Sequence, residues 1–285
     1  KQSADLIRSQ RNTSLADVLE VSRTEALKGT FKSAAQFDIS RQDASDIQFQ
    51  VASVINRRKN PEKFANAERI AGQFSGITGA SGETSGQLVG TALIAGLDPE
   101  LFARQAQLTA KGSKLNANQL VTMLNELTPL ANSNGISLVW LRNKLVALSN
   151  VITEPSKLKT TMERLIRNAA VGSEKLRELG FDVDNLGAEE LISAQVSVIS
   201  QKAKLGPVAL RKFAIDELKL PGEALQDLQK LSGPLLAQKE REINELVSTA
   251  APGQIQKQFD SPEFNDVSRR LNREVLETEQ VKIFG

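Results

Sequence analysis

The stretch SGITGASGETSGQLVG, residues 75–90, contains five glycines and one charged residue, Glu83, and is the first candidate for chemistry in this sequence. Glycine-rich loops that bind nucleotides present backbone N–H groups to phosphates, but a Walker-type loop also needs Lys followed by Ser or Thr. No Lys occurs in residues 79–86 or directly after them. A dinucleotide-binding loop needs a buried strand before its glycines, whereas FANAERIAGQF has a helical pattern. We therefore predict that this stretch does not bind phosphate.

Three absent residue types exclude most enzyme mechanisms. The 285 residues include no Cys, His or Tyr. A thiolate or imidazole zinc site, a Ser-His-Asp or Cys-His pair and a disulfide are therefore excluded. Asp and Glu total 34, so a carboxylate pair for sugar hydrolysis stays open, but Glu163 and Glu178 lie beside Arg164 and Arg177 and fit surface positions. We expect no enzyme activity and no catalytic, cofactor-binding or metal-binding residue.

Charge gives little support for nucleic-acid binding. The formal net charge is +2, and two short basic clusters occur, NRRKN at residues 56–60 and SRRLNR at residues 268–273. Proteins that bind single strands interleave basic residues with aromatic residues on which bases stack, and these clusters contain no aromatic residue. We interpret them as solvated helix ends and expect no sequence-specific nucleic-acid partner.

The glycines Gly82, Gly86 and Gly90 recur at every fourth residue, as in closely packed helix pairs of membrane proteins. The apolar run LVGTALIAGL that follows is about half of the ~20 residues that a spanning helix requires. We predict a joint instead. In this interpretation GITGAS ends one helix and forms a polar turn, Ser81 caps the next helix, and that small-residue helix packs closely against a neighbour.

Helical periodicity dominates the rest of the chain. Apolar residues recur at steps of three and four in four segments: Leu120, Leu124, Leu127 and Ala131; Leu138, Leu141, Leu145 and Leu148; Leu158, Met162, Leu165 and Ala169; and Leu210, Phe213, Ala214 and Leu218. The alternating residues Ile47, Phe49 and Val51 continue into helical spacing, so we predict a helix there as well. The segment LLAQKEREINELV contains about two heptads, too few for a long coiled coil.

Helix starts and turns are marked by two recurring formulas. Asn60-Pro61-Glu62, Asp98-Pro99-Glu100 and Ser261-Pro262-Glu263 each offer a capping side chain, a proline at the first helical position and an early acid. Gly96, Gly135 and Gly180 can each end a helix in the left-handed conformation before a new one begins.

We predict an all-α fold of multiple short-to-medium helices in hairpins or a bundle, either compact or elongated, with no substantial sheet. Along the chain we expect an N-terminal helical segment at 1–74, a glycine-rich joint at 75–90, a helical-hairpin region at 91–236 and C-terminal helices at 237–285. The chain opens KQSADLIRSQ without Met and shows no signal peptide, which indicates a processed or partial chain.

The order of these elements resembles the tape measure proteins of bacteriophage tails. The resemblance lies in SGITGAS followed by GQLVGTALIAGL and DPELFARQAQLTAKGSKLNANQLVTMLNEL, then in LRELGFDVDNLGAEELISAQVSVISQ and LRKFAIDELKLPGEALQDLQKL. It covers roughly residues 72–236. One departure is Leu220-Pro221-Gly222, where relatives often carry Phe-Gly. No catalytic residue is carried over, because this region of the family has none.

The resemblance implies a structural role in the virion, in the lumen or at the tip of the phage tail. Such a protein sets tail length, leaves during DNA ejection, and is in the host cytoplasm during assembly. Its partners would be tail tube and tail tip or baseplate proteins and further copies of itself in a small fixed number, with transient contact to the host envelope. If all residues were helical the chain would span roughly 430 Å, but the turn signals favour hairpins over one rod.

Three alternatives stay open. The chain could be an internal ejection protein of a short-tailed phage, a carboxylate-dependent cell-wall hydrolase, or a helical scaffold or effector unrelated to phage. Two aromatic residues are also ambiguous. Trp140 fits an interface anchor or a core position, and Phe284 fits a docking residue or a frayed terminus.

Overall fold

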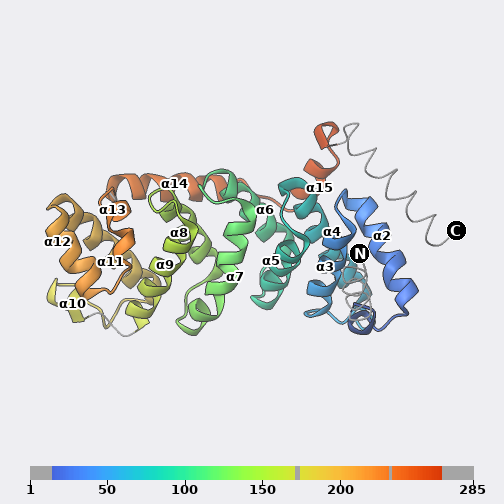
Figure 1. Ribbon diagram of the computed structural model, residues 1–285, viewed down its shortest axis with the longest axis horizontal. Coiled ribbons are helices and arrows are strands. Elements are labelled where there is room, and N and C mark those ends of the chain that lie inside the picture. Colours follow the sequence, from blue (N-terminus) through green and yellow to red (C-terminus); the bar gives the residue numbers. More distant parts are fainter. Residues whose placement is uncertain (1–14, 171–173, 231–232, 265–285) are drawn as a thin grey trace, which may run out of the picture. The chain divides into compact units, whose positions relative to one another are not determined.

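The computed structural model describes residues 15–170, 174–230 and 233–264 (Figure 1). Within these ranges every regular element is a helix, and the prediction of an all-α fold is confirmed. By their internal contacts the residues form two compact units. Of the described residues, those up to Gln107 and those from Ala250 onward belong to unit 1, and those from Leu108 to Thr249 belong to unit 2.

Unit 1 contains the helices of the N-terminal half and a short C-terminal helix. After one helical turn at residues 15–19, its elements are α2 (Arg23–Phe37), α3 (Arg41–Ala52), α4 (Pro61–Thr78), α5 (Gly82–Ile94), most of α6 (Pro99–Lys111), α15 (Gln254–Phe259) and the 3₁₀ helix η3 (Pro262–Phe264). The helices α2 to α5 pack on one another, and α15 packs on α4.

The glycine-rich stretch contains the turn between α4 and α5. Gly79 caps the end of α4 in the left-handed conformation, with φ 69°, and its N–H donates to the carbonyl oxygen of Ser75 at 2.8 Å. Ser81 then caps α5, and its hydroxyl accepts from the N–H of Thr84 at 3.2 Å. The predicted helix stop, turn and new cap are confirmed, and the turn itself occupies residues 79–81.

The four-residue glycine spacing of α5 produces a close contact with α3. A Cβ atom added at Gly82 would lie 2.0 Å from the carbonyl oxygen of Asp43, and one at Gly86 would lie 2.6 Å from a side-chain atom of α3. A Cβ at Gly90 would meet Cγ2 of Val54 at 3.2 Å. Asp43 also accepts a hydrogen bond from the N–H of Gly82 at 2.6 Å. The predicted close packing of a small-residue helix is confirmed.

Unit 2 is packed through larger apolar side chains. Its elements are α7 (Ala117–Ser133), α8 (Leu138–Ser149), α9 (Pro155–Ala170), α10 (Glu174–Glu178), α11 (Ala188–Lys204), α12 (Pro207–Arg211), the π-helix η1 (Lys212–Glu217), the 3₁₀ helix η2 (Gly222–Ala224), α13 (Leu225–Leu228) and α14 (Gly233–Ser248). All residues of the four periodic apolar sets predicted above are buried, so these helix faces form the core. The first three sets lie in regular α-helices, whereas the fourth begins in α12 and continues through the π-helix η1.

Several predicted starts and turns are confirmed and some are corrected. At Asp98 the carboxylate accepts from the N–H groups of Glu100 and Leu101 at 2.9 and 3.0 Å. At Asn60 the helix starts as predicted, but the side chain makes no capping hydrogen bond. Gly96, Gly135 and Gly180 all have positive φ.

The helix expected directly after Gly180 begins later. Residues 181–187 are irregular apart from a turn at 183–185, and α11 starts at Ala188, where the Glu190 carboxylate accepts from the N–H of Gly187 at 2.7 Å. In the C-terminal part, Ser261 precedes only the short helix η3 before the described residues end. The division of the chain at residues 74, 90 and 236 stays a prediction. A search of the described helices finds none with the length and apolar character to span a bilayer.

Candidate functional site

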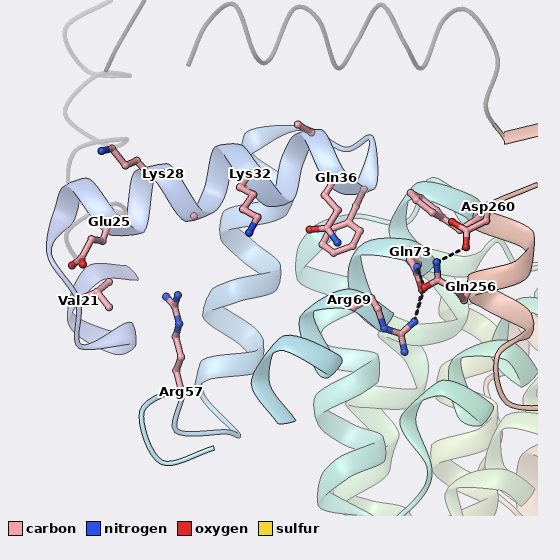
Figure 2. A pocket seen from close by; sticks show the side chains of 14 residues that line it. Val21, Glu25, Lys28, Lys32, Gln36, Arg57, Arg69, Gln73, Gln256 and Asp260 are labelled. Atoms are coloured by element: carbon pink, nitrogen blue, oxygen red, sulfur yellow. Dashed lines mark hydrogen bonds between the residues drawn. The ribbon is translucent and has the colours of Figure 1, made fainter. Parts of the chain in front are cut away.

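Unit 1 has an open groove beside α2, which we call the α2 groove (Figure 2). Its volume is about 890 Å³, and it is lined by residues of α2, α4 and α15 and by Arg57 from the turn after α3. Lys28, Lys32 and Gln36 follow one another along the same side of α2 because they are spaced by four residues. The groove therefore presents a row of cationic and amide side chains.

One end of the groove is closed by a network of amide and guanidinium groups. Arg69 on α4 donates to the side-chain oxygens of Gln73 at 2.8 Å and Gln256 at 3.1 Å, and Gln256 donates to Asp260 at 2.6 Å (Figure 2). Arg69 also forms an ion pair with Glu100 at 3.2 Å. The charge of Arg69 is thus compensated inside unit 1, and the network fixes α15 on α4.

Two further cations of the groove are Lys32 and Arg57. Lys32 is exposed and makes no ion pair within the described residues, and Arg57 lies over the ring of Phe64 at 5.7 Å from its centroid. Glu25 is the acid on this side. The backbone N–H and hydroxyl of Ser22 donate to its carboxylate at 3.0 and 2.8 Å, and with Arg57 and Arg58 nearby they hold the pKa of Glu25 below its ordinary value. The groove can therefore accept carboxylate or amide groups of a partner through hydrogen bonds and charge.

A second, smaller cavity lies in unit 2 where α8, α11 and α14 meet. Its volume is about 170 Å³, and Trp140 and Lys144 of α8 form part of its wall. Lys144 is buried and bonds to the carboxylate of Glu240, and its Nζ lies 5.2 Å from the Trp140 ring centroid. Trp140 is half-buried beside this ion pair. It is therefore partly in the core and partly exposed, between the core position and the interface anchor considered from the sequence.

The same helix buries a second cation. Arg142 has no exposed surface, and this burial lowers its pKa to about 10. Its Nε and Nη2 atoms donate to Oδ1 of Asn143 at 3.2 and 3.0 Å, and Asn143 in turn donates to Asn244 at 3.1 Å. At neutral pH Arg142 is therefore charged, and its guanidinium donates charge-assisted hydrogen bonds within unit 2.

The acids considered for catalysis lie apart from both cavities. Glu163 pairs with Arg167 at 2.9 Å, one helical turn away, and not with the adjacent Arg164. Glu178 is exposed. Among the described residues no group of three or more Asp or Glu side chains is placed to hold a metal ion.

The structure describes only the first of the two basic clusters considered from the sequence. In the first cluster Arg58 pairs with Glu20 at 3.3 Å, and Arg57 lines the α2 groove. These residues lie in the turn between α3 and α4 and not at the end of a regular helix. The second cluster, residues 268–273, and Phe284 lie outside the described residues.

Neither the α2 groove nor the burial of Arg142 and Lys144 was predicted from the sequence. The four-residue spacing of Lys28, Lys32 and Gln36 was a readable signal for a shared face. Arg142 and Lys144 sit among apolar residues in LVWLRNKLVAL, which was the available signal for buried charge. Scans against protein-family models and searches of curated proteins and solved structures find no match to this chain.

Proposed function

We propose that this chain is a structural protein of a phage tail, of the tape measure type, located in the tail tube lumen or at the tail tip. The observation that carries the proposal is the ordered resemblance over residues 72–236. Its segments correspond to the joint before α5, to α5 itself, to α6 and α7, and to the region from α10 to α13.

The physical character of the chain is consistent with this role. The sequence contains no Cys, so no disulfide holds the helices together, and aromatic residues make up only 4%. Successive helices are joined by short turns with glycine in the left-handed conformation at Gly79, Gly96 and Gly135. A chain of short helices without cross-links can unfold stepwise through a narrow tube, which a tape measure protein must do when DNA leaves the particle.

Within this proposal the α2 groove contacts an acidic segment of a tail tube or tip protein. Its exposed cation Lys32 has no ion-pair partner in the described residues, so a carboxylate from a partner would gain a charge-assisted contact there. The variant Lys32→Glu should lower incorporation of the chain into tails, and Lys63→Glu, an equally exposed change on α4, should not. Equal incorporation of both variants would remove the groove from the proposal.

The first test is peptide mass mapping with copy-number quantification on purified tails. Peptides from this chain at a small fixed number per tail would support the proposal. Their absence from tails, with the chain found in capsids, would favour an internal ejection protein. Detection only in the cytosol would favour a scaffold or effector.

A second test measures tail length in deletion variants. Removing the hairpin α4–α5 or the hairpin α7–α8 deletes nearly the same length of helix from each unit, about 45 Å at ~1.5 Å per residue. If these residues act as a ruler, both deletions should shorten the tail by the same amount. Intact tails of unchanged length would show that this part of the chain does not measure length.

A further inference from the structure

Among the described residues of unit 2, the most exposed large apolar side chains lie at the turn between α11 and α12. Leu205 is 71% exposed and Val208 is 82% exposed, and the exposed Pro207 lies between them. Single exposed apolar residues are normal on protein surfaces. Here three such residues lie within four positions at the end of a hairpin and form a small apolar patch. We call Leu205, Pro207 and Val208 the α11–α12 tip.

The tip is held in place by the core beneath it. On the α11 side Ile199 is buried, and on the other side Leu210 and Phe213 are buried. The chain reverses at Gly206, whose φ of 110° and ψ of 174° suit glycine because it lacks Cβ. The apolar side chains of the tip therefore project from a packed hairpin.

Cations surround the tip without acidic partners. Lys202 and Lys204 precede it, and Arg211 and Lys212 follow it. Among the described residues no ion pair involves any of these four side chains, although many other cations of unit 2 are paired, as in Lys144–Glu240 and Arg167–Glu163. Between Glu190 and Asp216 the sequence contains no acid at all, so all the charges of residues 191–215 are positive.

We propose that the α11–α12 tip binds the surface of an anionic lipid bilayer, with Leu205 and Val208 entering the interface and the four cations contacting lipid phosphates. Apolar residues that reach the acyl boundary and basic residues at the headgroups act together in interfacial binding. Aliphatic side chains distinguish this surface from one for single-stranded nucleic acid, on which aromatic residues stack the bases. The inference rests on the tip alone and does not depend on the proposed tail function.

The test is co-sedimentation of the full chain with vesicles of phosphatidylcholine, with and without phosphatidylglycerol. Wild type should bind the anionic vesicles and be released at about 1 M salt, where the Debye length falls to about 3 Å. The double variant L205S/V208S should weaken binding about tenfold or more, and K202Q/K204Q should weaken it to a similar degree. All four side chains are outside the core, so the fold should be unchanged.

Matched controls come from unit 1. Ile94 is 74% exposed, so Ile94→Ser removes a similar apolar area away from the tip. Lys59 and Lys63 are both exposed, so K59Q/K63Q removes two charges elsewhere. Equal losses in the control variants would overturn the assignment to the tip, and failure of wild type to bind anionic vesicles would overturn it outright.

A second readout uses the absence of cysteine. The variant Val208→Cys provides one thiol for an environment-sensitive fluorophore, and Ile94→Cys provides its control. The label at position 208 should shift to the blue on addition of anionic vesicles, while the label at 94 should not. Binding to anionic vesicles without this shift would overturn the proposal, because the apolar residues would then not enter the interface. Sedimentation velocity gives a further check. If wild type self-associates and L205S/V208S does not, the tip is an interface between copies and the proposal is overturned.

Discussion

α5 of unit 1 and α8 of unit 2 are both buried along most of their length, but with side chains of opposite size. The buried residues of α5 include Gly82, Gly86 and Gly90, and its glycine face meets α3. The buried residues of α8 include Leu141, Leu145 and the two cations described above. The packing of α5 therefore requires glycines, which have no Cβ atom. The packing of α8 requires large side chains and polar partners for its buried charges.

This difference predicts how each unit fails. At α5 a methyl group added at Gly82 collides with backbone atoms of Asp43, and one added at Gly86 collides with Cβ of Gln50; neither neighbour can move away without shifting α3. At α8 a removed side chain leaves a cavity or an unpaired charge, which its surroundings relax only in part. Trp140 is the single Trp and lies in unit 2, so its fluorescence reports that unit, while circular dichroism reports both.

The largest effect is expected from G82A/G86A. The two Cβ atoms would lie 2.0 and 2.6 Å from atoms of α3, and overpacking of this kind should lower the free energy of unfolding by about 4 kcal/mol. The control is Gly90→Ala, because Val54 can move away and Ala favours a helix by about 1 kcal/mol over Gly.

Urea denaturation followed by circular dichroism and by Trp140 fluorescence separates the outcomes. G82A/G86A should shift the dichroism transition and leave the Trp140 transition in place. A G90A variant as unstable as the double variant would show that the close contact of α3 and α5 is not the cause.

The next largest effect is expected at Arg142. Arg142→Ala leaves a cavity in the core of unit 2 and should lower the free energy of unfolding by about 3 kcal/mol. Arg142→Met keeps most of the volume and removes the buried charge, so it should change stability by less than about 1.5 kcal/mol. The midpoint of the Trp140 fluorescence transition in urea measures both. If the methionine variant is as unstable as the alanine variant, the hydrogen bonds of the guanidinium, not its volume, stabilise α8.

A smaller effect is expected at the Lys144–Glu240 ion pair. Lys144 is 6% exposed, so Glu240→Gln weakens the compensation of a buried charge and should cost about 1–2 kcal/mol. Adding Lys144→Met should recover part of that loss, because no buried charge then remains at position 144. Dichroism in urea is the appropriate measurement, since Trp140 contacts Lys144 directly. A double variant less stable than E240Q would show that the pair is not coupled in this way.

How far the sequence predicts the structure depends on the range of the interaction. The turn at Gly79 and the cap at Ser81 were predicted because a few neighbouring residues determine them. The glycine face of α5 was predicted to pack closely, but its partner α3 was not. That choice depends on contacts such as Asp43 with Gly82, which are far apart in the chain.

The candidate site was less predictable for the same reason. The α2 groove joins Lys32 of α2, Arg57 of a turn and Gln256 of α15, and no local pattern connects these three segments. The burial of Arg142 follows from helices packed around α8. The π-helix at Lys212–Glu217 adds a residue per turn that helical periodicity does not reveal.

The smallest effect is expected from exposed acids whose pKa is lowered by local hydrogen bonds, one in each unit. The capping box with Ser22 lowers the pKa of Glu25 below its ordinary value of 4.5, and hydrogen bonds from Lys157 and then Ser156 lower that of Glu154. A carboxyl group with a lowered pKa in the folded state stabilises the fold above its unfolded pKa and loses this contribution as pH falls through the folded value.

Glu25→Gln and Glu154→Gln should therefore lower the urea midpoint slightly at neutral pH and leave it unchanged at the acid end of the range, where the wild-type carboxyl is also neutral. Because Glu154 belongs to unit 2, only E154Q should move the Trp140 transition, and E25Q should move dichroism alone. A pH-independent difference for either variant would mean that the hydrogen-bond geometry of the glutamate, and not its charge, stabilises that helix start. Movement of the Trp140 transition by E25Q would instead show that the two units unfold together, and the contrast between α5 and α8 would then have to be measured in each unit expressed alone.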